Sequence, residues 1–178
     1  MILKLTKPVT FGEKTLSEIT LREPTIGEAM SVMALLTAED HVGYLMSLIA
    51  SVATIQFQFV EEMGMADINE ASKFLQEFPL VPTLDFRGKK IQTPFRVPVT
   101  PTITHGNKAL DCLEINDPLA KMVREANKLL TGSEFTLDKV QARNFKLVQL
   151  ITGTEVVLLQ RVPLTQFREA EEAALSFL

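Results

Sequence analysis

The sequence predicts an α+β protein made of two similar small units, each a β-hairpin followed by about three helices. Two observations lead to this fold class. The segment GEKTLSEITLREPT, which begins at Gly12, is partly repeated 94 residues later as GNKALDCLEINDPL, which begins at Gly106. In each half, extended segments also give way to apolar residues at helical spacing. A constant offset of this kind indicates a tandem duplication.

The predicted units cover residues 1–82 and 97–178, and a proline-punctuated, strand-like arm over 83–96 joins them. Later in the chain the offset grows to 99, as between Phe78 and Phe177, which indicates an insertion in the second copy. Units of this size lie near the lower limit for a self-sufficient core. We therefore expect them to pack against each other or against a partner.

The first unit opens with two extended segments around a turn at Gly12, which predicts a hairpin. Thr25 and Glu28 then form a capping-box pattern, in which a hydroxyl and a carboxylate satisfy the free N–H groups of a helix start. Arg22 and Glu23 complete the most motif-like charged set of the chain. We interpret this set as a structural cap with an ion pair, in preference to a catalytic group.

Two further helices are predicted in the first unit. The first has its apolar face between Tyr44 and Val52, and the second begins at a cap pattern at Asp67. Between them, residues 55–60 (IQFQFV) alternate apolar and polar side chains and allow two interpretations. They form either an edge strand that could pair with a partner or a continuation of the preceding helix. Their counterpart over 154–160 predicts a short helix.

The arm and the second unit repeat this order of elements. Residues 87–89 (RGK) are typical of a hairpin turn, and the prolines at 94, 98 and 101 argue against a central strand position. We interpret the region as an edge hairpin or a linker. A helix follows Pro118, a longer one runs from about 136 to 151, and the last occupies 165–177.

Composition and charge exclude several classes of protein. A single cysteine, Cys112, excludes an internal disulfide framework and suits a reducing compartment. No stretch approaches 18 apolar residues, and the N-terminus lacks the apolar core of a signal peptide, so no membrane association is expected. The net charge is −6 over residues 1–82 and +2 over 83–178. The sequence has no concentrated basic face of the kind that binds nucleic acid.

The sequence also predicts no enzyme, no cofactor and no metal site. His41 and His105 have no partner at metal-ligand spacing. The chain contains no phosphate-binding loop, nucleophile elbow or HExxH motif. A small hydrolase or nucleotide-binding protein is therefore disfavoured.

Several segments resemble a known family. Residues Lys7 to Gly12 (KPVTFG) and Leu21 to Thr25 (LREPT) are similar to the opening of the tail assembly chaperones of Mu-like and related long-tailed bacteriophages. Residues 150–153 (LITG) and 162–167 (VPLTQF) resemble the closing region of that family. Family members usually contain a single unit. The second copy here lacks the Arg-Glu-Pro-Thr motif, and the segment 83–96 has no counterpart in the family.

The resemblance implies a non-enzymatic chaperone of tail assembly. Such proteins bind the tape measure protein, keep it soluble, help to recruit tail tube subunits and are then displaced. The implied location is the cytoplasm of the infected or lysogenic bacterial host, outside the mature virion. The alternative is a structural, minor tail component that stays in the virion through a large interface, which the strand-rich segment 83–104 would supply.

A partner-binding surface is predicted from the methionines, five of which lie between residues 30 and 65. Methionine side chains are flexible and occur on helix-binding surfaces. The candidate residues are Met30, Met33, Phe59, Met63 and Met65. Core filling is the alternative interpretation. Because Met63 and Met65 flank Gly64 near a predicted loop, they are the better candidates for an exposed contact. Units this small often associate, so a homo-oligomer is also considered.

Overall fold

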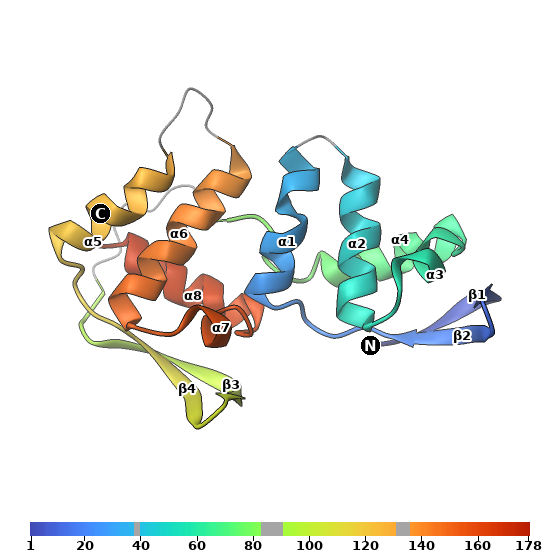
Figure 1. The fold of residues 1–178 in the computed structure, drawn as a ribbon, viewed down its shortest axis with the longest axis horizontal. Helices are drawn as coiled ribbons and strands as arrows, with labels where there is room; N and C mark the ends of the chain where they lie inside the picture. The colour runs from blue at the N-terminus through green and yellow to red at the C-terminus, as the bar shows by residue number, and fades with distance from the viewer. Residues whose placement is uncertain (38–39, 83–90, 131–135) are drawn as a thin grey trace.

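A computed structural model describes residues 1–37, 40–82, 91–130 and 136–178 of the chain (Figure 1). It confirms the predicted fold class, because a β-hairpin followed by helices is succeeded by a second hairpin followed by helices. The elements of the first unit are β1 (Ile2–Phe11), β2 (Lys14–Thr20), α1 (Ile26–Thr37), α2 (His41–Ala53), α3 (Phe57–Glu61) and α4 (Met65–Leu75).

The second unit follows in the same order. Its elements are β3 (Phe95–His105), β4 (Lys108–Ile115), α5 (Ala120–Asn127), the short 3₁₀ helix η1 (Lys128–Leu130), α6 (Leu137–Thr152), α7 (Val156–Leu159) and α8 (Leu164–Leu175). Within the described residues the first unit has one more α-helix than predicted, the short helix α3, whereas the short helix α7 of the second unit lies in the predicted range 154–160. The predicted turn at 87–89 lies outside the described residues.

Both hairpins are antiparallel and pair in the same register. Phe11 faces Lys14 across the first turn, and His105 faces Lys108 across the second, 94 residues later. The glycine of each turn has a positive φ, 60° at Gly12 and 58° at Gly106, which favours glycine because it has no Cβ. Each register also shifts once, in the middle of the first strand.

Prolines fit into β3 because the sheet has only two strands. Pro98 and Pro101 both lie within this strand, and β3 pairs with β4 alone among the described residues. Both strands are therefore edges, where the missing N–H of proline is tolerated. This agrees with the predicted exclusion of a central strand position.

The helices correspond at the larger offset of 99 residues. Thr54 caps the C-terminus of α2, with φ of 56°, and Gly153 caps that of α6, with φ of 64°, both in the left-handed conformation. Gly64 precedes α4 as Pro163 precedes α8. These offsets are what a duplication would produce, and a common origin of the two units stays a prediction.

The segment 55–60 forms neither of the two predicted structures. Residues 57–61 are helix α3, so no edge strand is present there. The left-handed turn at Thr54 separates this helix from α2, so α2 does not continue through it. The counterpart α7 is the short helix that the sequence predicts.

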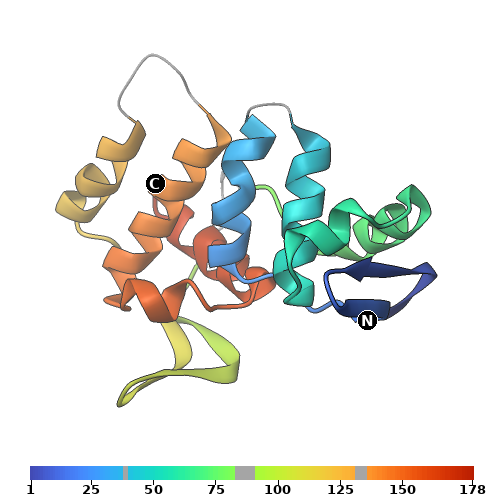
Figure 2. The same cartoon turned by 45° about the vertical axis from the view of Figure 1, so that its right-hand side comes forward.

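The two units pack against each other through α1. Helices α5, α6, α1 and α2 lie side by side (Figures 1 and 2), with α1 in contact with both α2 and α6. Ile26 and Ala29 of α1 belong to the hydrophobic core of the second unit, and Leu80 packs against both cores. No helix within the described ranges is long and apolar enough to cross a membrane.

Candidate partner-binding site

The structure buries most of the residues predicted to bind a partner. Met33, Phe59 and Met63 are all less than 10% exposed, and Met30 is half-buried against the core of the second unit. Only Met65, at 60% exposure, presents its side chain to solvent. In this conformation three of the five predicted residues fill the core. A binding role for Met65 stays a prediction.

Phe59 lies in the segment 55–60, where apolar and polar side chains alternate, yet its ring is buried. Its ring meets the ring of Phe11 edge-on, with 5.7 Å between the centroids, and closes the first core under the β1–β2 hairpin. Met63 joins the same core from the turn before α4. Both contacts join residues that are distant in sequence.

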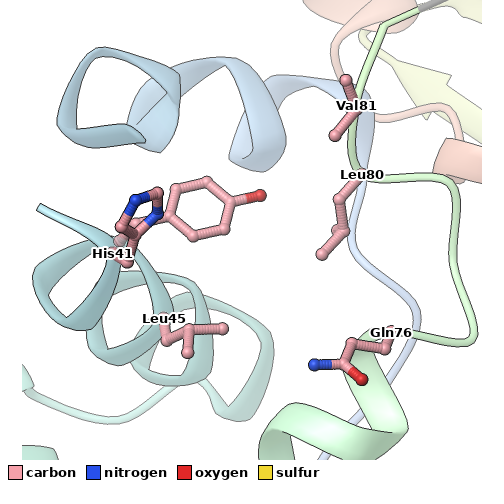
Figure 3. Close-up of a pocket in the computed structure, with 6 residues that line it drawn as sticks. His41, Leu45, Gln76, Leu80 and Val81 are labelled. Carbon is pink, nitrogen blue, oxygen red and sulfur yellow. The ribbon is translucent and has the colours of Figure 1, made fainter. Parts of the chain in front are cut away.

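An apolar pocket of about 240 Å³ lies elsewhere in the first unit, where the chain leaves α4 (Figure 3). Helix α2 contributes one wall, and the segment after α4 contributes the opposite wall. The residues that line the pocket are His41, Tyr44, Leu45, Gln76, Leu80 and Val81. None of them was singled out as a binding residue from the sequence.

Tyr44 gives the pocket its one buried polar group. The side chain is 5% exposed, and its hydroxyl has no hydrogen-bond partner in the described part of the chain. Burial raises the pKa of this phenol, while the positive charge of Arg168 acts in the opposite direction. The hydroxyl therefore stays neutral and is free to donate or accept one hydrogen bond.

The second unit holds the far wall of the pocket in place. Arg168 of α8 donates to the backbone oxygens of Pro79 and Leu80, at 3.0 and 3.1 Å. The same guanidinium is 2.8 Å from the carboxylate of Glu171 and 2.6 Å from the side-chain oxygen of Gln141. Because Arg168 and Glu171 are buried, the chain at Leu80 is fixed by a rigid polar cluster of the other unit.

The near wall is fixed by the start of α2. The side chain of Asp40 accepts a hydrogen bond from the backbone N–H of Gly43 at 2.9 Å, which caps the helix. His41 and Tyr44 lie in the first turn of this helix and line the pocket, and Figure 3 labels His41 on this wall.

The charged set at the start of α1 is a structural cap, as predicted. Arg22 makes two hydrogen bonds to the carboxylate of Glu28, at 2.6 and 2.8 Å. Glu28 also accepts from the backbone N–H of Thr25 at 2.8 Å and from the hydroxyl of Ser51 at 2.9 Å. Burial opposes ionisation, but these donors outweigh it and lower the pKa of Glu28 to about 2.

No cluster of three or more metal-ligating side chains occurs in the part of the chain that the structure describes. Cys112 is a free, half-buried thiol on β4. The geometry of the pocket instead suits the binding of an apolar side chain.

A comparison with known protein families finds a match within the first unit. Residues 3–79 match a family described as "Phage tail assembly chaperone proteins, E, or 41 or 14". No curated protein and no solved structure gives a match. The matched range includes α2 and α4, and with them His41, Tyr44, Leu45 and Gln76 of the pocket. Residues 3–79 are thus similar to the phage tail assembly chaperone family, which confirms the predicted resemblance over this range and supports a role in tail assembly.

Proposed function

We propose that the protein is a non-enzymatic chaperone that keeps the tape measure protein of the phage soluble and helps to recruit tail tube subunits around it. The observation that carries this proposal is an apolar pocket built mainly from residues of the matched family unit, with an unpartnered tyrosine hydroxyl inside it. The chaperone would act in the host cytoplasm and leave before the virion is complete.

The chemistry of the pocket fits a helix with exposed apolar side chains. A cavity of ~150 Å³ is large enough to bind benzene, so a pocket of about 240 Å³ accommodates one large apolar side chain. An amphipathic helix presents such side chains on one face and binds grooves through them. A tape measure protein, as a long apolar helical chain, would offer many such anchors.

The hydroxyl of Tyr44 would add one hydrogen bond to this contact. A carbonyl or hydroxyl beside the inserted side chain would satisfy a group that is otherwise buried without a partner, and an unsatisfied group of this kind costs about 1–3 kcal/mol. With one side chain and one hydrogen bond per site, each contact stays weak. Weak contacts suit a chaperone that must later release its client.

The test is co-expression with the tape measure protein of the same phage, followed by affinity capture and a solubility assay. We expect a soluble complex with the unaltered chain. Val81→Asp would abolish it, because Val81 is half-exposed at the pocket and a charge there has no partner. Tyr44→Phe would weaken it, with the fold retained. The matched control is Val157→Asp, since Val157 is 41% exposed on α7, away from the pocket.

Two outcomes would reject the proposal. The first is the absence of any complex together with the protein in washed virions, which identifies a structural tail component instead. The second is a complex that survives Val81→Asp as well as it survives Val157→Asp, which places the binding surface elsewhere. Circular dichroism of each variant establishes that it is folded before binding is compared.

A further inference from the structure

One contact inside the chain joins the two units through backbone hydrogen bonds. The segment 23–27, which leads into α1, lies on the segment 160–165, which leads into α8. Four hydrogen bonds join them: Ile26 N to Val162 O (3.0 Å), Gly27 N to Gln160 O (2.9 Å), Leu164 N to Pro24 O (2.9 Å) and Thr165 N to the carboxylate of Glu23 (2.7 Å).

Each unit contains a counterpart of both segments, but in this contact the first unit uses only 23–27 and the second unit uses only 160–165. The counterpart of 160–165, at the offset of 99, is segment 61–66 before and within α4. The counterpart of 23–27, at the offset of 94, is segment 117–121, which leads into α5. Segment 61–66 makes no contact of this kind with 117–121 in the described structure. In Figure 1 the two segments lie near opposite ends of the molecule.

The unused halves expose two apolar residues, of which Met65 corresponds to a residue that the used contact buries and Leu119 corresponds to the polar, half-buried Thr25. Leu164 is fully buried, whereas its counterpart Met65 is 60% exposed. Leu119, the counterpart of Thr25, is 56% exposed. A hollow of about 490 Å³ between β1 and the turn before α4 lies beside Met65. Docking of a segment 117–121 on a segment 61–66 would therefore bury both exposed side chains.

Backbone and charge favour the same pairing. The N–H groups of Met65 and Ala66 open α4, which has no side-chain cap, and no acceptor for either occurs among the described residues. The carbonyl of Pro118 would accept from Met65 N–H as that of Pro24 accepts from Leu164, and Asp117 would accept from Ala66 N–H as Glu23 accepts from Thr165. Lys121 would lie beside Glu61, and both are exposed and of opposite charge. The halves that contain the two surfaces also differ in net charge, −6 against +2.

We propose that copies of this protein associate head to tail, with segment 117–121 of one copy docked on segment 61–66 of the next. The two surfaces differ, so the interface is heterologous, and each added copy leaves one surface of each kind free. Assemblies larger than a dimer result, as a ring where the rotation between copies closes and as an open chain where it does not. This inference is independent of the proposed client and of the pocket around Tyr44.

One substitution makes the contact between copies weaker than the contact within the chain. A Cβ at Gly27 would lie 2.7 Å from the backbone oxygen of Gln160, so this position has no room for a side chain. Lys121 occupies the corresponding position in the second unit. The intermolecular contact must therefore open slightly at Lys121, and we expect association that is reversible and dependent on concentration.

The test is sedimentation velocity of the full chain over a range of concentrations. We expect the mean mass to rise with concentration beyond that of a dimer. Met65→Asp and Leu119→Asp would each weaken association by about tenfold or more, because each buries an unpaired charge in the contact. Ile2→Asp is the control, since Ile2 is 65% exposed and lies outside both surfaces. Lys121→Gly would strengthen association.

Mixing the two variants separates this arrangement from a symmetric dimer. Met65→Asp keeps an intact 117–121 surface, and Leu119→Asp keeps an intact 61–66 surface. An equimolar mixture would therefore form dimers and nothing larger, whereas each variant alone would stay monomeric. The proposal is overturned if the unaltered chain is monomeric at every concentration, if the mixture fails to dimerise, or if Ile2→Asp weakens association as much as Met65→Asp.

Discussion

The carboxylate of Asp67 accepts hydrogen bonds from both the backbone N–H and the hydroxyl of Thr6, at 3.1 and 3.0 Å. Thr6 lies where the pairing of β1 with β2 is interrupted, so its N–H is satisfied by a helix instead of a strand. Gln166 makes the equivalent contact in the second unit, where it accepts from the N–H of Thr100 at 3.1 Å and donates to its carbonyl at 3.0 Å. Both hairpins are thus attached to their last helix at the same point.

Removal of the Asp67 side chain would destabilise the first unit. Asp67 is 3% exposed, and Asp67→Ala leaves the N–H of Thr6 without an acceptor at a cost of about 1–3 kcal/mol. Gln166→Ala would cost less, because its hydrogen bonds to Thr100 are exposed and water replaces them. The free energy of unfolding, measured in urea, would check both. Asp67→Asn keeps an acceptor oxygen and would recover part of the loss; equal losses for Asp67→Asn and Asp67→Ala would contradict this account.

Asp67 also shows where local sequence patterns reach their limit. The sequence predicted a cap at Asp67, but α4 begins two residues earlier at Met65, and the carboxylate binds β1 instead. The hairpin turns and the capping box of α1 were predicted correctly because each depends on a few adjacent residues. The partner of Asp67 lies 61 positions away in the sequence, and no short-range pattern encodes such a distance.

The candidate pocket was missed for the same reason. It joins α2, the end of α4 and the chain at Leu80, and its far wall is held by Arg168 of the other unit. Tyr44 recurs at the same helical spacing as core residues, so periodicity alone cannot show that its hydroxyl is left without a partner. The positions of the methionines could not distinguish core from surface, because flexible side chains occur both in cores and on binding surfaces.

Glu28 makes stability depend on pH in the acid range. Its pKa is about 2 in the folded protein, against an ordinary value of 4.5. A lowered pKa contributes stability that is fully present above pH 4.5 and is lost as the pH falls towards 2. Glu28→Gln would lower the free energy of unfolding by up to about 3 kcal/mol near neutral pH. The variant would also lose less stability than the unaltered chain as the pH falls from 4.5 to 2. Urea unfolding at several pH values would measure both effects.

The control for Glu28 is Glu114→Gln. Glu114 pairs with Arg96 at 2.9 Å, but both side chains are largely exposed, and such pairs contribute about 0–1 kcal/mol. We expect its pH profile to match that of the unaltered chain. If the two variants show the same profile, the cap at α1 is not the source of the acid sensitivity.

Gly27→Ala would disrupt the packing of α1 on the second unit. The added Cβ would lie 2.7 Å from the backbone oxygen of Gln160, which cannot move without shifting α7. Overpacking of this kind costs about 1–3 kcal/mol, although alanine favours a helix more than glycine does. Ser31→Ala, at an exposed position of the same helix, serves as the control. Urea unfolding that shows Gly27→Ala to be as stable as Ser31→Ala would rule out the close contact.

Arg168 and Glu171 form the buried ion pair on which both the second core and the pocket wall depend. Their charged atoms are 2.8 Å apart, and both side chains are almost fully buried. Arg168→Met would leave the charge of Glu171 in the core without its guanidinium, and breaking a buried pair in this way costs about 3–5 kcal/mol. Arg168→Met with Glu171→Leu removes both charges and would recover most of the loss, because apolar replacement of a buried pair is often neutral.

Lys73→Met, which breaks the exposed pair with Glu70, would change the free energy of unfolding by less than about 1 kcal/mol. A double variant no more stable than Arg168→Met would show that the hydrogen bonds of Arg168 to the Pro79 and Leu80 carbonyls, more than its charge, hold the two units together.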